Sequence, residues 1–237
     1  MESVAFAAMR PVGPKIAEGR DSEIYDHGPG KVLRVARDQR SLLEEAEVMS
    51  YARSNGYPAP AVYDAGDGYL VMERVDGPTM LADAVPFRIG RSAKLLASLH
   101  EQLHRLPAPP WLTREAPLPG DRLLHCDLHP LNVLIGPNGP VVIDWTNASR
   151  GAPAFDVADT WVLFACGDPP LNRIEALLAP LARKLFLRSF LNGLDQQSAR
   201  EAIPLAVAHR LRDRNMTEHE RDRMQTMARW ASDVDAT

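Results

Sequence analysis

The chain has 237 residues, enough for one or two domains that each bury an apolar core. Hydrophobic residues make up 45% of it and charged residues 24%, a composition that excludes an intrinsically disordered or fibrous protein. The formal net charge of −4 gives no general attraction to nucleic acid or to an anionic membrane, so we expect neither as a partner.

Cysteine usage and hydropathy indicate the compartment. Only Cys126 and Cys166 are present, which excludes a disulfide framework and fits a reducing environment. The apolar run 4–9 is short and has no basic start, unlike a signal peptide. The longest later apolar run, 161–166, is far below the ~20 residues that span a bilayer. We therefore expect a soluble cytoplasmic protein, either a monomer or a homodimer.

The first third of the chain is predicted to form strands separated by glycine-rich turns. These strands are 15–19, 23–26, 31–36, 61–64 and 69–74. A helix is expected over 38–54, where Asn55 and Gly56 stop it. The break Asp76-Gly77-Pro78 marks a lobe boundary, which predicts domains at 1–75 and 76–237.

The second part of the sequence is mostly helical in pattern. Residues 89–106 carry leucines at i, i+3 and i+4 spacing, typical of an amphipathic helix. A proline-rich loop at 107–120 follows, and then short apolar strands at 123–125 and 141–143 flank a turn at 136–139. The three closing helices are predicted at 171–192, 198–213 and 217–232, the last opening with a capping box of Thr217 and Glu220. Strands first and helices afterwards predict a two-lobed α+β fold.

Oxygen-bearing side chains follow the two short strands of this second part. Asp127 follows the first strand, Asn132 lies five residues later, and Asp144 ends the second strand. If the two strands return as a hairpin, these three side chains meet in one cleft. Two carboxylates and an amide oxygen are hard ligands that suit Mg²⁺, and a carboxylate left off the metal could accept a proton from an attacking hydroxyl.

The run His-Cys-Asp-Leu-His-Pro-Leu-Asn at 125–132, followed by Ile-Asp-Trp at 143–145 and by Asp156, resembles the aminoglycoside phosphotransferase and choline kinase-like family. The resemblance covers about residues 15–165. It implies the two-lobed protein-kinase-like fold, with a small β-rich N-lobe that binds the nucleotide and a mostly helical C-lobe that holds the catalytic loop, the metal and the acceptor. It also implies a kinase that transfers the γ-phosphoryl group of ATP or GTP to a hydroxyl of an aminoglycoside or other antibiotic, an amino alcohol or a sugar.

Carried over position by position, the resemblance gives roles to the polar residues. Asp127 is the expected catalytic base, and Asn132 and Asp144 are the expected Mg²⁺ ligands. Asp156 is expected to anchor the catalytic loop by accepting backbone hydrogen bonds.

The resemblance further implies a cation on an N-lobe strand that holds the nucleotide phosphates and pairs with a helix glutamate. We favour Arg34 as this cation, although lysine is usual there and arginine differs in geometry. Lys31 is the nearest alternative, but strand alternation sends it to the opposite face. Glu45 lies in an apolar helix stripe, where a carboxylate is costly unless paired, and is therefore the expected partner.

Three more positions are expected to contact the nucleotide. Ser22, in the loop 19–22, either donates to a phosphate or is only a turn residue. The backbone carbonyl of Glu73 and the backbone amide of Val75 match the hinge that reads the nucleobase edge.

Other functional interpretations of the sequence stay open. The missing strand lysine allows a catalytically weak, nucleotide-binding regulatory protein. His125 and His129 allow a zinc hydrolase, although that would leave the spacing to Asp144 unexplained. A protein kinase is disfavoured because only eleven residues separate Asp144 from Asp156, too few for an activation segment.

The acceptor itself is not identified by the sequence. From residue 168 onward there are ten acidic and eleven basic residues, which is no evident trap for a polycation, although Asp159, Glu175 or Asp195 could line a local pocket. We interpret the charge run 210–214 as a solvated helix face.

Overall fold

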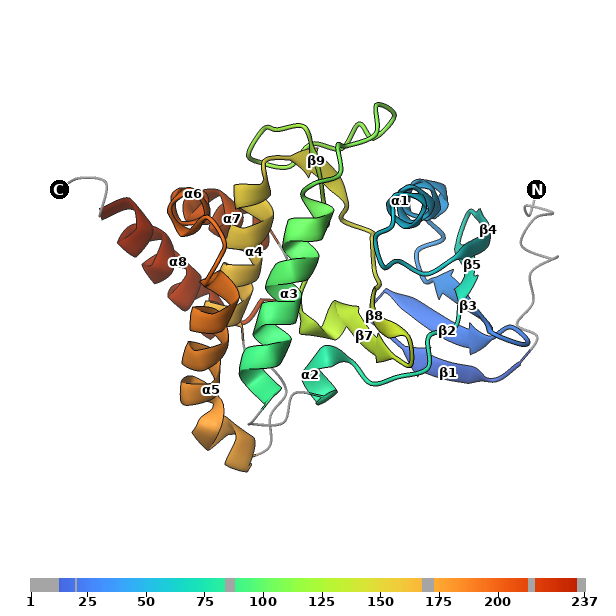
Figure 1. The fold of residues 1–237 in the computed structure, drawn as a ribbon, viewed down its shortest axis with the longest axis horizontal. Coiled ribbons are helices and arrows are strands. Elements are labelled where there is room, and N and C mark those ends of the chain that lie inside the picture. The colour runs from blue at the N-terminus through green and yellow to red at the C-terminus, as the bar shows by residue number, and fades with distance from the viewer. Residues whose placement is uncertain (1–12, 20, 84–87, 168–172, 213–215, 234–237) are drawn as a thin grey trace. The chain divides into compact units, whose positions relative to one another are not determined.

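The computed structural model describes residues 13–19, 21–83, 88–167, 173–212 and 216–233 (Figure 1). The chain forms two compact units, each taken separately below. The first consists of Met1–Pro78 and Val133–Thr146, and the second of Thr79–Asn132 and Asn147–Thr237. No helix in the described ranges is long and apolar enough to cross a membrane. The fold is α+β, as predicted, with a β-rich N-terminal region and a helical remainder.

An antiparallel five-stranded sheet forms the centre of the first unit, in the order β1-β2-β3-β5-β4. Its strands are β1 (Lys15–Glu18), β2 (Ser22–Asp26), β3 (Lys31–Ala36), β4 (Val62–Gly66) and β5 (Tyr69–Glu73). All five match predicted strands to within two residues at either end. The central strand β3 is paired on both sides, and Leu33 on it is fully buried.

Helix α1 (Leu43–Ser54) begins later than the predicted residue 38. The Asp38 carboxylate accepts a hydrogen bond from the backbone of Arg40, and Ser41 forms an isolated bridge with Asp67, so the chain stays irregular up to Leu42. The helix ends where expected, because Gly56 follows with a φ of 81°, in the left-handed region that glycine tolerates.

The predicted pairing of strands 123–125 and 141–143 is wrong. Strand β8 (Gly139–Val142) pairs with β7 (Val133–Gly136), a strand that was not predicted, and both belong to the first unit. Strand β6 (Arg122–Leu124) pairs instead with β9 (Ser149–Gly151) in the second unit. The physical reason is the two-residue turn between β7 and β8, which closes with Gly139 at a φ of 120° and makes immediate neighbours pair.

Helices make up most of the second unit. They are α2 (Met80–Asp83), α3 (Ile89–Leu103), α4 (Pro153–Cys166), α5 (Arg173–Leu191), α6 (Gln196–Glu201), α7 (Ile203–Arg210) and α8 (Glu218–Asp233). The helix predicted at 198–213 is two helices, because Pro204 starts a new one within the first turn of α7. The predicted capping box of α8 is present: the Thr217 amide donates to Glu220 Oε2 at 2.9 Å, and the Glu220 amide donates to Thr217 Oγ1 at 3.1 Å.

Helix α4 was not predicted, although the core of this unit forms around it. It packs against α5, α6, α7 and α8, and its buried residues include Phe155, Ala158 and Val162. A helix buried on most sides shows no contrast between an apolar and a polar face, so the period-3.6 signal is missing. The core is completed by Ile203 and Met224 from α7 and α8.

Candidate active site

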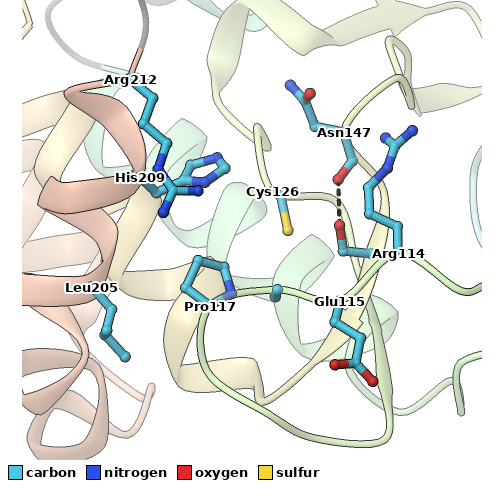
Figure 2. A pocket seen from close by; sticks show the side chains of 10 residues that line it. Arg114, Glu115, Pro117, Cys126, Asn147, Leu205, His209 and Arg212 are labelled. Atoms are coloured by element: carbon cyan, nitrogen blue, oxygen red, sulfur yellow. Dashed lines mark hydrogen bonds between the residues drawn. The ribbon is translucent and has the colours of Figure 1, made fainter.

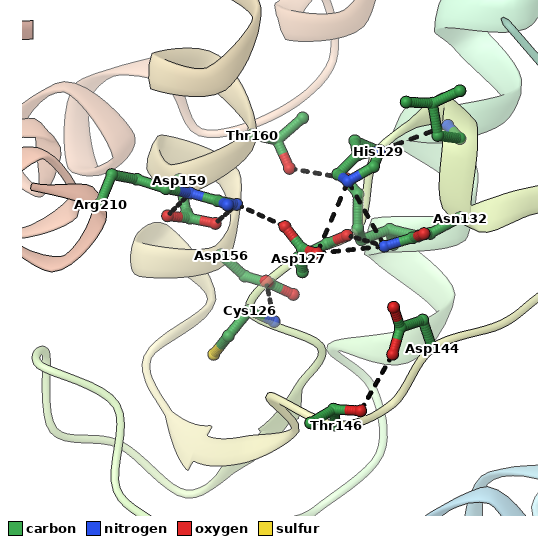
Figure 3. A network of polar contacts seen from close by, with 12 residues as sticks. Cys126, Asp127, His129, Asn132, Asp144, Thr146, Asp156, Asp159, Thr160 and Arg210 are labelled. Atoms are coloured by element: carbon green, nitrogen blue, oxygen red, sulfur yellow. Dashed lines mark hydrogen bonds and ion pairs between the residues drawn. The ribbon is translucent and has the colours of Figure 1, made fainter. Parts of the chain in front are cut away.

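The segment expected to form the catalytic loop begins where β6 ends, and one buried carboxylate fixes it. Asp156 in α4 accepts hydrogen bonds from the backbone amides of His125, at 3.1 Å, and Cys126, at 2.7 Å. Cys126 has a φ of 57°, so the backbone turns sharply at this point in a conformation that costs energy unless the surroundings hold it. The anchoring role expected of Asp156 is therefore present in the structure (Figure 3).

Two histidines complete the anchor, His100 in the last turn of α3 and His104 just after the helix. His104 Nε2 lies 3.0 Å from Asp156 Oδ2, and His100 Nδ1 lies 3.8 Å from the same oxygen. Burial alone would raise the pKa of Asp156, but the hydrogen bond from His104 and the nearby imidazoles hold it well below its usual range. Full burial lowers the pKa of His100 to about 3, so its ring is neutral at physiological pH.

Within the described residues, His100, His104 and Asp156 also form a group with the spacing of metal ligands. The Asp156 oxygens already accept hydrogen bonds from two backbone amides and face His104, which accounts for the group as a structural anchor. The zinc-hydrolase hypothesis required His125 and His129, and neither belongs to this group.

Asp127, the expected catalytic base, lies one residue further along this loop. Its Oδ1 accepts a hydrogen bond from Arg210 Nη2 at 2.8 Å, and its Oδ2 lies 3.2 Å from Asn132 Nδ2 and 3.6 Å from His129 Nε2 (Figure 3). Burial opposes ionisation, but His129 and Arg210 outweigh it and hold the pKa of Asp127 well below its usual range. The carboxylate is therefore ionised at neutral pH.

The side chain of Asn132, one of the two expected metal ligands, is held by the same loop. Asn132 ends the 3₁₀ turn η2 (Pro130–Asn132), is 8% exposed, and donates from Nδ2 to the backbone carbonyl of Asp127 at 2.9 Å. Its contacts with Asp127 all use the amide nitrogen. A cation would therefore be bound through the amide oxygen.

Arg210, the last residue of α7, is a member of this network that the sequence interpretation missed. Its Nε donates to Asp159 Oδ1 at 2.8 Å, and its Nη2 contacts both Asp159 Oδ2 and Asp127 Oδ1. The prediction of a solvated face over 210–214 is wrong for Arg210, whose side chain is 14% exposed, because α7 packs on α4. Arg212 is exposed as predicted but lies beyond the end of α7, while residues 213 and 214 lie outside the described residues.

The sequence held a hint of a buried cation near Asp159, although not of which arginine supplies it. Asp159 sits between apolar residues of α4, and a carboxylate buried there needs a cation. The Asp159 side chain is only 1% exposed, so it pairs with Arg210 and does not line an open acceptor pocket. Burial raises the pKa of Asp159 to about 6, against the opposing influence of Arg210. Of the other two acidic candidates, Asp195 caps α6 through Ser198, and the side chain of Glu175 lies outside the described residues.

The first unit brings a second group of predicted residues together around Arg34. Arg34 Nη1 lies 2.5 Å from Glu45 Oε1, and both side chains are under 10% exposed. The guanidinium also donates to Ser22 Oγ at 3.1 Å and to Asp144 Oδ1 at 3.2 Å. The ion pair expected between Arg34 and Glu45 is therefore present, and the Ser22 hydroxyl is engaged by Arg34.

Lys31 lies on the other face of the sheet. Its Nζ sits 4.5 Å from the centre of the Tyr63 ring, a cation–π contact, as the alternation of side chains along β3 predicts. Lys31 is therefore not part of the cluster around Arg34.

Asp144 follows β8 and is held in the same cluster. Its φ is 63°, in the left-handed region, and Thr146 Oγ1 lies 3.0 Å from Asp144 Oδ1 and 3.0 Å from Glu45 Oε2. The side chain of Asp144 is 44% exposed, so the carboxylate remains accessible to a cation. Thr146, which was not predicted, joins the metal-ligand candidate to the ion pair.

Glu73 and Val75, the two residues expected to form the hinge, lie at the end of β5 and just beyond it. The Glu73 carboxylate accepts a hydrogen bond from the Ala61 amide at 3.0 Å and pairs with Arg53 at 3.1 Å. Its side chain is thus used for local structure. Val75 is half-buried, and its Cγ1 lies beside Gly136 of the β7–β8 hairpin.

A cavity of about 520 Å³ opens within the second unit beside the loop that carries Asp127 (Figure 2). Cys126 lines it, together with His209 of α7, Arg212 just beyond the end of that helix, and Arg114 from the proline-rich loop. Burial and the neighbouring arginines lower the pKa of His209. The cavity therefore borders the residue that precedes Asp127 and the residue that precedes Arg210.

Within the first unit, the predicted residues Ser22, Arg34, Glu45 and Asp144 share one network. Within the second, Asp127 and Asn132 share another.

The family model described as the phosphotransferase enzyme family (APH) matches residues 13–121 and 110–194 of this chain. Among curated protein sequences, none matches it.

Three solved structures illustrate the similarity of the fold. A choline/ethanolamine kinase family protein from Mesorhizobium loti is 15% identical, with a TM-score of 0.55 over 95% of this chain and 89% of that one. APH(2'')-IIa, in a ternary complex with streptomycin and ATP, is 15% identical, with a TM-score of 0.57 over 83% and 82%. The amicoumacin kinase hAmiN, in complex with AMP-PNP, Ca²⁺ and Ami, is 12% identical, with a TM-score of 0.53 over 98% and 92%.

Proposed function

Because the chain belongs to the phosphotransferase enzyme family, we propose that it transfers the γ-phosphoryl group of ATP or GTP to a hydroxyl group of a small molecule, with Mg²⁺. That it is a phosphotransferase of the small-molecule kinase class follows from the family. The nucleotide donor is supported by the ATP and AMP-PNP bound in two of the similar structures. The other small molecules in those complexes are streptomycin and Ami, and a hydroxyl-bearing antibiotic, amino alcohol or sugar is the acceptor class we propose here.

The observation that carries the proposal is the state of Asp127. It is ionised, is held at both carboxylate oxygens, and lies on a loop that Asp156 anchors through two backbone amides. Phosphoryl transfer passes through a loose transition state, so a base contributes mainly by orienting the attacking hydroxyl and taking its proton late. A fixed carboxylate of low pKa suits that task.

We propose that Asn132 and Asp144 hold the Mg²⁺ ion. Their donor atoms, an amide oxygen and an accessible carboxylate, are the hard ligands that Mg²⁺ prefers, so the residues fit the metal. When bound, the ion neutralises charge on the phosphate oxygens. The chain contributes the ligands and, through Thr146, the hydrogen bond that orients Asp144.

The rest of the nucleotide site is proposed to come from residues 1–75. Arg34, oriented by Glu45, would bind the phosphates with the planar fork of donors that suits them. Ser22 would contribute its backbone amide or its hydroxyl proton, since accepting from Arg34 uses only a lone pair of that hydroxyl. The Glu73 carbonyl and the Val75 amide would read the nucleobase edge. Residues 76–237 would carry the catalytic loop and the acceptor site, and we propose that the enzyme acts in the cytoplasm, where its two free cysteines stay reduced.

Replacement of Asp127 by asparagine tests the proposal. The variant should lose phosphoryl transfer by at least about 100-fold, the usual contribution of a positioned base, while nucleotide affinity stays within about twofold. Transfer is measured as release of the nucleoside diphosphate with Mg²⁺ across a panel of hydroxyl-bearing acceptors. Asp121→Asn is the matched control, since the side chain of Asp121 is 77% exposed.

Two results would contradict the proposal. Full transfer by the Asp127→Asn variant would show that another group is the base. A wild-type protein that binds nucleotide but turns over none with any acceptor would favour the alternative, a regulatory nucleotide-binding protein. The arginine in place of the usual strand lysine is the feature that would then explain the weak catalysis.

A further inference from the structure

The contact between Arg210 and Asp127 joins α7 to the catalytic loop. Arg210 Nη2 donates to Asp127 Oδ1 at 2.8 Å, although 83 residues separate the two in sequence. Both side chains are largely buried, at 14% and 19% exposed, so the ion pair is shielded from solvent. An interaction of this kind is stronger and more directional than a surface salt bridge.

Arg210 does not need Asp127 as a partner for its charge. Asp159 already faces it in a bidentate arrangement, with Nε on Oδ1 at 2.8 Å and Nη2 on Oδ2. Asp159 is 1% exposed and lies on α4, whose residues Phe155 and Val162 belong to the hydrophobic core of this unit. The pair Arg210–Asp159 is thus a complete, rigid unit that presents one further N–H to Asp127.

The consequence for Asp127 is that different elements hold its two oxygens. Arg210 at the end of α7 binds Oδ1, and Asn132 in the 3₁₀ turn η2 approaches Oδ2 at 3.2 Å. A carboxylate held at both oxygens keeps its plane fixed, whereas one held at a single oxygen still rotates about its last torsion. One guanidinium faces two carboxylates, so the group of three side chains keeps a net negative charge. This charge favours the transfer of a proton from an incoming hydroxyl group to Asp127.

We propose that Arg210 is a positioning residue for phosphoryl transfer: it fixes the orientation of Asp127, and Asp159 fixes Arg210. The inference rests on the proposed function, in which Asp127 receives the acceptor hydroxyl. Misplacement of a catalytic group by about 1 Å costs roughly 100-fold in rate, so the loss of this contact should appear in kcat.

Three substitutions in the full-length protein test this role, namely Arg210→Gln, Arg210→Lys and Arg210→Ala. The measurements are kcat and KM for phosphorylation of an acceptor, nucleotide hydrolysis without acceptor, and the melting temperature. Arg210→Gln should lower kcat about 10- to 100-fold and leave the KM for nucleotide within about twofold. Guanidinium chloride at tens of millimolar should restore several-fold of the lost kcat in Arg210→Ala, because the free ion can occupy the same place.

Arg229→Gln is the control, since Arg229 is exposed on α8 and bonds to Thr226. It should keep wild-type kcat and gain nothing from guanidinium. A folded Arg210→Gln protein with kcat within twofold of wild type would overturn the inference, and so would a loss in Arg210→Ala that guanidinium leaves unchanged. If Arg210→Gln does not fold, Arg210→Lys decides in the same way: reduced kcat at an unchanged melting temperature supports positioning, and wild-type kcat refutes it.

The same measurements separate this inference from the proposed function. If the wild-type protein neither phosphorylates an acceptor nor hydrolyses nucleotide, both the proposed function and the role of Arg210 are refuted. If the wild-type enzyme is active, Asp127→Asn inactivates it and Arg210→Gln does not impair it, only the role of Arg210 is refuted.

Discussion

Arg34 and Glu45 form a buried ion pair in which Nη1 and Oε1 lie 2.5 Å apart and the side chains are 8% and 5% exposed. The pair explains two unusual choices in the sequence together. A glutamate lies in the apolar face of α1 because a permanent cation meets it there, and the strand cation is an arginine whose fork also reaches Ser22 and Asp144.

Removing the cation from this pair should affect both stability and nucleotide binding. Arg34→Ala leaves the Glu45 carboxylate buried without its partner, which costs about 3–5 kcal/mol in the free energy of unfolding. Nucleotide affinity should fall by about tenfold or more, since a hydrogen bond to a charged group contributes about 1.5–3 kcal/mol. Urea denaturation and nucleotide titration measure the two effects. Lys31→Ala is the control, because Lys31 lies on Tyr63, and a larger loss of affinity in that variant would place the phosphate cation at residue 31.

The proposed metal ligand is tested by the dependence of nucleotide binding on Mg²⁺. Asp144→Asn keeps the shape of the side chain and a hydrogen-bonding oxygen near Thr146, but removes the charge that binds a cation. Loss of a ligand should weaken metal affinity by at least about tenfold, because even residues that only orient ligands contribute 10- to 100-fold. Titration of nucleotide with and without Mg²⁺ should show metal-assisted binding in the wild type and in Asp64→Asn, an exposed control on β4. Metal-assisted binding that survives in Asp144→Asn would exclude Asp144 as the ligand.

Acid should destabilise the protein through His100. Burial lowers its folded-state pKa to about 3, below the ordinary value of 6.5, so only the unfolded state takes up a proton between these two values. The contribution of His100 to the free energy of unfolding is therefore fully present well above pH 6.5. It falls as the pH drops, by up to about 1.4 kcal/mol per pH unit between the two pKa values. Between pH 7.5 and pH 5.0, this group should account for about 2 kcal/mol of lost unfolding free energy.

Urea denaturation of His100→Gln at the two pH values checks this effect. The variant should lose about 2 kcal/mol less than wild type between pH 7.5 and pH 5.0, whatever its stability at pH 7.5. The control is His219→Gln, at an exposed position in α8. Equal acid sensitivity in wild type and His100→Gln would show that His100 is not the group responsible.

The two cysteines should report unfolding. Cys126 and Cys166 are 3% and 2% exposed, and burial raises the pKa of both thiols, so little reactive thiolate is available in the folded protein. An aromatic disulfide reagent at pH 8 should modify neither in the native protein and both in concentrated guanidinium chloride. Ser54→Cys, at an exposed site, should react at once and serves as the positive control. Rapid labelling of the native wild-type protein would contradict this packing.

Arg34 and Glu45 could be predicted because a strand and a helix place side chains on their faces with a regular period, so the face on which each charge lies follows from the sequence. Alternation along β3 separated Arg34 from Lys31, and the helical stripe of α1 singled out Glu45. Asp156 was found through a family pattern, and its two backbone hydrogen bonds are present.

What the sequence concealed depends on tertiary packing. Arg210 looks like any surface arginine until α7 is seen to pack on α4 and to bring it against Asp159. Helix α4 itself gave no signal, because nearly every side of it is buried. The pairing of β8 with β7 was missed because turn geometry, which depends on Gly139, decides it rather than hydrophobicity.

The first unit is assembled from two stretches that are separated by more than fifty residues of the other unit. The second stretch is tied in by the Val142 amide, which bonds to the Pro58 carbonyl at 2.7 Å, and by the edge-to-face contact of Trp145 with Tyr57. The five-stranded sheet is complete by residue 73, but the unit as a whole is complete only when residue 146 has been synthesised, after the segment that carries Asp127. A fragment that stops at residue 78 would lack this closing hairpin, and the two units cannot be separated by a single cut in the gene.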